Sequence, residues 1–148
     1  EVAQITEKSL RDVLEVRRAL ENLAVQLACL RMSPQTLADL KAAARAFEEI
    51  LGGEDVTAVA EADVAFHDVI YMATDNQRLI SLLNNLREQM YRYRMEYLKD
   101  IAVRRTLAEE HKAICRALRE RDEQQAEEYV SIHIDNQQKA IIRSLSQE

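Results

Sequence analysis

Glycine, proline and tryptophan are almost or wholly missing from this sequence of 148 residues. It contains two glycines, one proline and no tryptophan. Because the turns of a many-stranded sheet use glycine and proline heavily, their scarcity argues against a β-rich protein and favours long helices joined by short connections. The length suits one domain with a complete hydrophobic core.

Other absences exclude further classes of protein. The sequence has no long uncharged apolar run and no signal peptide, so we expect neither a membrane-spanning helix nor secretion. The formal charge of −6 is opposite in sign to a surface that binds nucleic acid, so we do not expect this segment to contact DNA itself. Only Cys29 and Cys115 occur, both among apolar residues. We expect them to be reduced core thiols of a cytoplasmic protein.

Apolar residues recur at helical spacing along most of the chain and predict an antiparallel, all-α bundle. The predicted helices lie at about residues 9–32, 34–51, 55–74, 77–99, 106–120 and from 122 to near the C-terminus. Four of these helix starts carry a capping pattern: Ser9 with Asp12, Ser33 before Pro34, Thr106 with Glu109, and Asp122 with Gln125. The first and fourth helices carry more apolar surface than one core needs, which predicts a homodimer.

The third predicted helix carries a carboxylate and an imidazole on its apolar stripe. Asp63 and His67 are four residues apart, which places them on one face of a helix, about one turn apart. Phe66 and Ile70 share that face, so we expect both polar side chains to point into the core. Such groups are unfavourable in a core unless another group satisfies them, and a metal ion can do so.

The other two histidines also lie on apolar stripes. His111 shares a face with Ile114 and Leu118, and His133 lies in the middle of the apolar face of the last helix. A single inward histidine is usually a satisfied core residue. Three inward histidines and a carboxylate, however, match the way in which helix bundles build metal sites. This donor set suits zinc, nickel, cobalt, manganese, iron or copper; Cys115 could compete as a ligand, although a buried thiol is the simpler interpretation.

Three arginines stand out near apolar positions. Arg17 lies within the stripe of the first helix, where it would pair with Glu21 or extend to the surface. The stretch YRYRMEY, residues 91–97, mixes aromatic residues with Arg92 and Arg94. That mixture can indicate RNA or single-stranded DNA binding. Because acidic residues surround it, a solvated helix face, or a tyrosine and an arginine lining a ligand cavity, is the better interpretation.

In four stretches the chain resembles the FCD domain, the C-terminal effector domain of FadR-subfamily, GntR-type bacterial transcription regulators. The stretches are LEVRRALENLAVQLA, ADVAFHDVIYMATDN, EEHKAICRALRERDEQQAEEYV and SIHIDNQ, so the resemblance covers nearly the whole chain. Its specific elements are Asp-x3-His, then Glu-His-x2-Ile, then a final histidine before an apolar residue. The spacing of 22 residues from His111 to His133 also matches the pattern of this family.

The resemblance implies a fold and a site. The family fold is an antiparallel bundle of six or seven helices with an internal metal and ligand cavity. In the metal-dependent branch, the matching residues bind a divalent metal; here they are Asp63, His67, His111 and His133. Zinc and nickel are favoured, and manganese, cobalt or iron would also suit. Arg17, in the Glu-Val-Arg motif, would face the cavity and pair with an effector carboxylate. Members that bind acyl-CoA lack this metal set, which disfavours an acyl-CoA effector.

The resemblance also implies a function. Family members carry an N-terminal winged helix-turn-helix domain that binds operator DNA as a homodimer. The present chain begins with Glu1 and lacks that domain, so we expect it to be part of a longer protein. Residues 1–148 would form the effector and dimerisation domain, which is not an enzyme. A small organic acid bound to the metal and to Arg17 would change DNA binding by the missing domain.

Two alternatives remain from the residues alone. A metal with open positions can activate water, so the bundle could be a hydrolytic enzyme. Against this, no further carboxylate or histidine stands out on the inward stripes as a general base. Alternatively, the metal could be purely structural and the bundle a dimerisation module.

Overall fold

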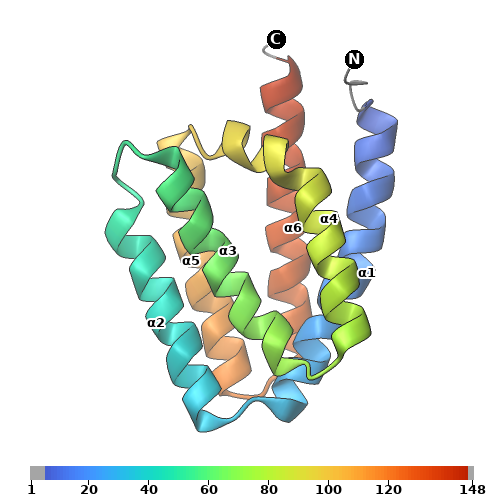
Figure 1. Ribbon diagram of the computed structural model, residues 1–148, viewed down its shortest axis with the longest axis vertical. Coiled ribbons are helices and arrows are strands. Elements are labelled where there is room, and N and C mark those ends of the chain that lie inside the picture. Colours follow the sequence, from blue (N-terminus) through green and yellow to red (C-terminus); the bar gives the residue numbers. More distant parts are fainter. Residues whose placement is uncertain (1–5, 147–148) are drawn as a thin grey trace.

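The computed structural model describes residues 6–146, which form six α-helices and, within that range, no β-strand (Figure 1). The helices are α1 (Glu7–Arg31), α2 (Pro34–Ile50), α3 (Val56–Ala73), α4 (Gln77–Tyr97), α5 (Ile101–Arg119) and α6 (Glu123–Ser146). Successive helices run in opposite directions (Figure 1). The prediction of an all-α antiparallel bundle is confirmed. In the described part of the chain, no helix combines the length and apolar character needed to cross a membrane.

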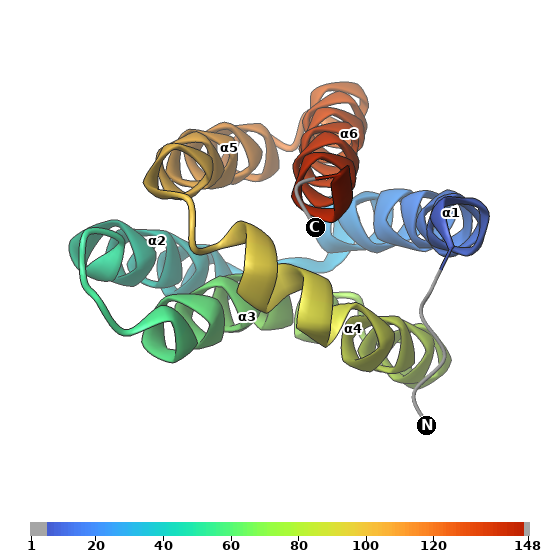
Figure 2. The same ribbon diagram turned by 90° about the horizontal axis from the view of Figure 1, so that it is seen from above.

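The helices form two facing rows, with α2, α3 and α4 in one row and α5, α6 and α1 in the other (Figure 2). The ends of the rows are joined by contacts of α2 with α5 and of α1 with α4. Large apolar side chains fill the space between the rows, among them the fully buried Phe47, Phe66, Leu107 and Ile134. The polar residues described below lie in this same interior.

Most predicted helix starts agree with the structure. Ser33, directly before Pro34, caps α2, and the side chain of Asp55 accepts a hydrogen bond from the backbone N–H of Ala58 at the start of α3. Asp122 accepts from the backbone N–H of Gln125 in the first turn of α6, as predicted.

Two predicted helix starts are wrong. The N-cap of α1 is Thr6, whose hydroxyl accepts from the backbone N–H of Ser9, the residue expected to be the cap. The helix α5 begins five residues before Thr106, with Asp100 as its N-cap. Thr106 lies inside α5 and donates to the carbonyl of Ala102. The capping pattern misled because a hydroxyl and a carboxylate three residues apart also occur on the exposed faces of helices.

Candidate metal centre

Asp63 lies in the middle of the bundle between two histidines. Asp63 on α3 and His111 on α5 are fully buried, and His67, one turn further along α3, is 3% exposed. Asp63 Oδ1 is 2.9 Å from His111 Nε2 and 3.4 Å from His67 Nε2. One potential ligand atom from each of these residues lies within 4.8 Å of the other two. The structure thus brings three of the four predicted ligands together.

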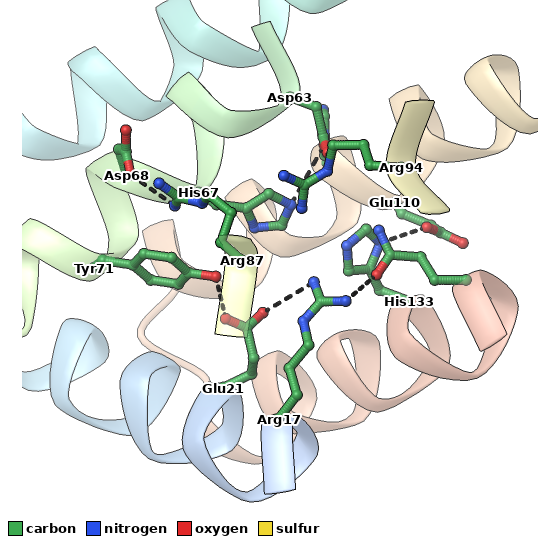
Figure 3. A network of polar contacts seen from close by, with 12 residues as sticks. Arg17, Glu21, Asp63, His67, Asp68, Tyr71, Arg87, Arg94, Glu110 and His133 are labelled. Carbon is green, nitrogen blue, oxygen red and sulfur yellow. Dashed lines mark hydrogen bonds and ion pairs between the residues drawn. The ribbon is translucent and has the colours of Figure 1, made fainter. Parts of the chain in front are cut away.

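His133 approaches this group from α6, but it is not part of the 4.8 Å cluster. Its ring centroid is 5.1 Å from that of His67 and 6.4 Å from that of His111. Its Nδ1 is 2.6 Å from Oε1 of Glu110 (Figure 3). The other oxygen of Glu110 accepts from the side-chain amide of Asn136. In metal proteins, an imidazole commonly contacts a carboxylate through the nitrogen that does not bind the ion. That arrangement would leave Nε2 of His133 for the metal.

The donor atoms of this cluster fit a divalent ion. Two donors bound at about 2.1 Å are about 3.0 Å apart at a right angle and about 3.4 Å apart at a tetrahedral angle. The distances from Asp63 Oδ1 to the two histidine nitrogens lie close to these values. In addition, Nε2 of His67 and Nε2 of His133 are buried and have no hydrogen-bond partner within residues 6–146. Unpaired buried polar atoms are unfavourable, and coordination would satisfy both.

The surroundings favour the protonation states that bind a metal. Burial alone would raise the pKa of Asp63, but His67, the hydrogen bond with His111 and the guanidinium of Arg94 hold it well below its usual range. Arg94 is 4% exposed, and its Nε is 3.3 Å from Asp63 Oδ2. Burial lowers the pKa of His67 to about 4, against the opposite effect of Asp63. At neutral pH the site therefore holds a carboxylate and a neutral imidazole, which are the coordinating forms.

Arg17 reaches the same interior from α1 (Figure 3). Its Nη2 is 3.8 Å from Glu21 Oε2, and its Nη1 donates to the side-chain oxygen of Gln137. Glu21 also accepts from the hydroxyl of Tyr71, and Gln137 donates to the hydroxyl of Tyr97 at 2.8 Å. The expected pairing of Arg17 with Glu21 is present, but Arg17 is 6% exposed and does not extend to the surface.

Comparison with known proteins decides the family. The FCD domain matches residues 12–136. The chain belongs to the FCD domain family. It is therefore a regulatory, effector-binding domain, as the resemblance of its motifs predicted.

Solved structures agree on the fold. The chain is similar to E. coli McbR/YncC, with 20% sequence identity and a TM-score of 0.85 over 99% of this chain and 73% of that one. It is also similar to Lar, described as controlling the expression of the Listeria monocytogenes agr system; the identity is 14% and the TM-score 0.80 over 94% of this chain and 66% of that one. Among curated proteins, none matches the sequence.

The sequence interpretation of this FCD domain did not place two carboxylates, Glu21 and Glu110, in the interior. Glu21 is 4% exposed and Glu110 is 9% exposed, so the interpretation that no further carboxylate stands out on the inward stripes is wrong. Glu21 follows Arg17 by four residues, which is a detectable signal. The sequence contains no such signal for Glu110, because its contact with His133 depends on how α5 and α6 align. Both carboxylates already have partners. Glu21 pairs with Arg17 and accepts from Tyr71, whereas Glu110 contacts His133. Neither is therefore a free general base.

Arg94 was left open between a solvated face and a ligand cavity, and the structure places it in the interior beside Asp63. Arg92, two residues earlier, is exposed. The signal for Arg94 was its spacing of four from Met90 and three from Tyr97, both of which are buried. Arginine is usually exposed in folded proteins, so a pattern of apolar residues alone does not predict that Arg94 is buried.

The cavity beside this cluster is small. A space of about 10 Å³ is bordered by Glu21, His67, Tyr71 and His133. This volume accommodates about one water molecule. An organic acid is larger than this space, so its entry requires neighbouring side chains to move. Arg17 lies near His133 (Figure 3) and is hydrogen-bonded to Gln137.

Proposed function

We propose that this FCD domain is the effector-sensing domain of a GntR-type, FadR-subfamily transcription regulator, and that it binds a divalent metal through four side chains. These are Asp63, His67, His111 and His133. The observation that carries the proposal is the buried convergence of Asp63, His67 and His111, with an unpaired His133 nitrogen nearby. When bound, the metal would supply a Lewis acid with open positions for effector oxygens.

The charges in the interior favour an effector with a single negative charge. Around the metal cluster, the buried anions are Asp63, Glu21 and Glu110, and the buried cations are Arg17 and Arg94. A third buried cation, Arg104, is not counted with them, because its guanidinium donates to backbone carbonyls elsewhere in the bundle. Histidines that coordinate a metal are neutral, so these five groups contribute one net negative charge, which a divalent ion would convert to one net positive charge. A monocarboxylate would neutralise the site, whereas a dicarboxylate would leave a buried charge without a partner. Among hydroxy-acids and dicarboxylates, this balance favours hydroxy-monocarboxylates.

Gln137 indicates how such an effector would act. Its side-chain oxygen occupies the position on Arg17 that an effector carboxylate would take. A carboxylate is the stronger acceptor for a guanidinium, so it would displace the amide. Arg17 lies on α1 and Gln137 on α6, and these two helices pack against each other. Effector binding would therefore change the α1–α6 contact and shift the population of conformations that bind DNA through the N-terminal domain.

A thermal-shift screen tests this proposal. Glycolate, glycerate and gluconate should raise the melting temperature of zinc- or nickel-loaded protein through linkage, and succinate should do so less. The shift should disappear after treatment with a chelator and should shrink in Arg17→Ala. Arg18→Ala is the matched control, because Arg18 pairs with Asp135 near the surface. Equal stabilisation of metal-free protein would indicate a purely structural metal and contradict the sensing mechanism.

A further inference from the structure

A second candidate binding site lies outside the metal centre, in a groove between α2 and α5. The two helices pack side by side at one end of the bundle (Figure 2). The groove has a volume of about 350 Å³, within the range of small-molecule pockets. Neither the predicted metal ligands nor Arg17 line it.

The floor of the groove is apolar. Leu37, Leu40 and Ala44 of α2 and Cys115 of α5 line it. Leu40 is fully buried, and Cys115 is half-buried with its Sγ 4.0 Å from the carbonyl oxygen of Leu40. The two helices are therefore in contact beneath the groove, and an apolar ligand group on this floor would be removed from water.

Cations line both walls. Lys41 and Arg45 come from α2, and Lys112, Arg116 and Arg119 from α5; among the described residues, Glu48 is the only carboxylate in the lining. Lys112 Nζ is 2.9 Å from Glu48 Oε1, which joins α5 to α2 across the groove. This concentration of positive charge contrasts with the formal charge of −6 of the whole chain.

Four of these cations have no ion-pair partner in the described part of the chain. Lys41, Arg45, Arg116 and Arg119 are exposed and form no ion pair with a carboxylate among residues 6–146. Burial raises the pKa of Cys115 to about 11, while Arg119 and Lys41 act in the opposite direction, so their charges lie near the floor. Like charges gathered in one groove repel each other, and a bound anion would relieve that repulsion.

We propose that this groove binds a small amphipathic oxyanion, in which an alkyl or aromatic body lies on the floor and a carboxylate or phosphate lies between the cationic walls. The guanidinium groups of Arg116 and Arg119 match either head group. The apolar floor distinguishes the site from a nucleic-acid surface, where stacking aromatics would accompany the basic residues. The groove shares α5 with the metal centre, because His111 points inward from the turn before Cys115.

Calorimetric titration of the 148-residue chain tests the chemistry. Decanoate and decyl phosphate are the anionic probes, and decanol and decyltrimethylammonium are the neutral and cationic comparisons. We expect at least one anionic probe to bind at least tenfold more tightly than either comparison. The double variant Lys41→Glu with Arg119→Glu should reduce that affinity at least tenfold. The matched control, Arg92→Glu with Arg105→Glu, reverses two exposed charges outside the groove and should change affinity less than twofold.

Protection of Cys115 tests the location. Cys29 is 3% exposed, so a thiol-reactive maleimide should label Cys115 first. The bound anionic probe should slow this labelling at least fivefold, in metal-loaded and in chelator-treated protein alike. Failure of both anions to bind, binding without protection, or equal binding by decanol would overturn the proposal. A result in either direction leaves the metal-sensing function untouched, because that function depends on different side chains.

Discussion

Asp63 is the residue on which the buried chemistry of this domain depends, because its carboxylate contacts two imidazoles and a guanidinium away from water. In metal-free protein, Arg94 is the only permanent cation on this carboxylate among the described residues. Arg94→Met would leave a buried charge unpaired and should lower the free energy of unfolding by about 3–5 kcal/mol. In zinc-loaded protein the loss should be smaller, because the ion supplies positive charge.

Urea denaturation with zinc and with a chelator measures this difference. Arg92→Met, an exposed position on the same helix, is the control and should change the free energy of unfolding by less than about 0.5 kcal/mol. Equal losses for Arg94→Met under both conditions would argue that no ion shares the site with Asp63.

His67 should make the metal-free domain sensitive to acid. An unfolded imidazole has a pKa of 6.5, and burial lowers that of His67 to about 4 in the folded protein. Between these values the unfolded state binds more protons, so the free energy of unfolding falls as the pH drops. His67 should contribute a loss of about 2 kcal/mol between pH 7 and pH 5. Urea titrations at both pH values should show this loss of stability, and the loss should be smaller in His67→Gln. If the free energy of unfolding of the parent did not change between these pH values, the burial argument would be refuted.

At the scale of the helix, apolar periodicity was sufficient to locate all six elements, but the start of α5 was not predictable from it. No glycine or proline separates α4 from α5; the break consists of Leu98, Lys99 and the capping Asp100.

Asp100→Ala should lower the free energy of unfolding by about 1 kcal/mol, because the Asp100 carboxylate accepts from a backbone N–H in the first turn of α5. Thermal denaturation measures this loss. Thr106→Ala is the control: because Thr106 lies within α5, this change should lower the free energy of unfolding by less than about 0.5 kcal/mol. A larger loss for Thr106→Ala than for Asp100→Ala would indicate that α5 begins at Thr106, as the sequence predicted.

The candidate site was predictable only where one helix defines it. Asp63 and His67 share a helix, so their spacing alone places them together. The contacts of Arg94 with Asp63 and of Glu110 with His133 join different helices. Such contacts depend on how far one helix is shifted along its neighbour, and a pattern within a single helix carries no information about that shift. For the same reason, the sequence could not reveal that the guanidinium of Arg17 donates to the side-chain oxygen of Gln137.

At the scale of the whole molecule, one face of the domain is more apolar than a solvated surface requires. Val16, Leu23 and Leu30 follow one another at seven-residue steps on α1 and are 51%, 39% and 72% exposed. This heptad spacing is typical of a helix that packs against another. We expect a homodimer through α1, and light scattering at tens of micromolar should give the mass of two chains.

Leu23→Glu combined with Leu30→Glu should convert that dimer to a monomer, because two charges would be buried in the interface. Met72→Glu is the matched control, since Met72 on α3 is 65% exposed and borders Thr36 and Asp39 of α2. A parent protein that scatters as a monomer, or a double variant that remains dimeric, would exclude α1 as the interface.

The binding of one metal ion by side chains from three helices is the central claim, and calorimetric titration of chelator-treated protein with zinc or nickel tests it most directly. We predict about one ion per chain for the parent. We predict at least tenfold weaker binding for His133→Ala, with the helical circular-dichroism spectrum retained. Gln125→Ala, exposed on the same helix, should bind like the parent. Absence of binding, or a His133→Ala variant that binds metal as tightly as the parent, would contradict the four-ligand site.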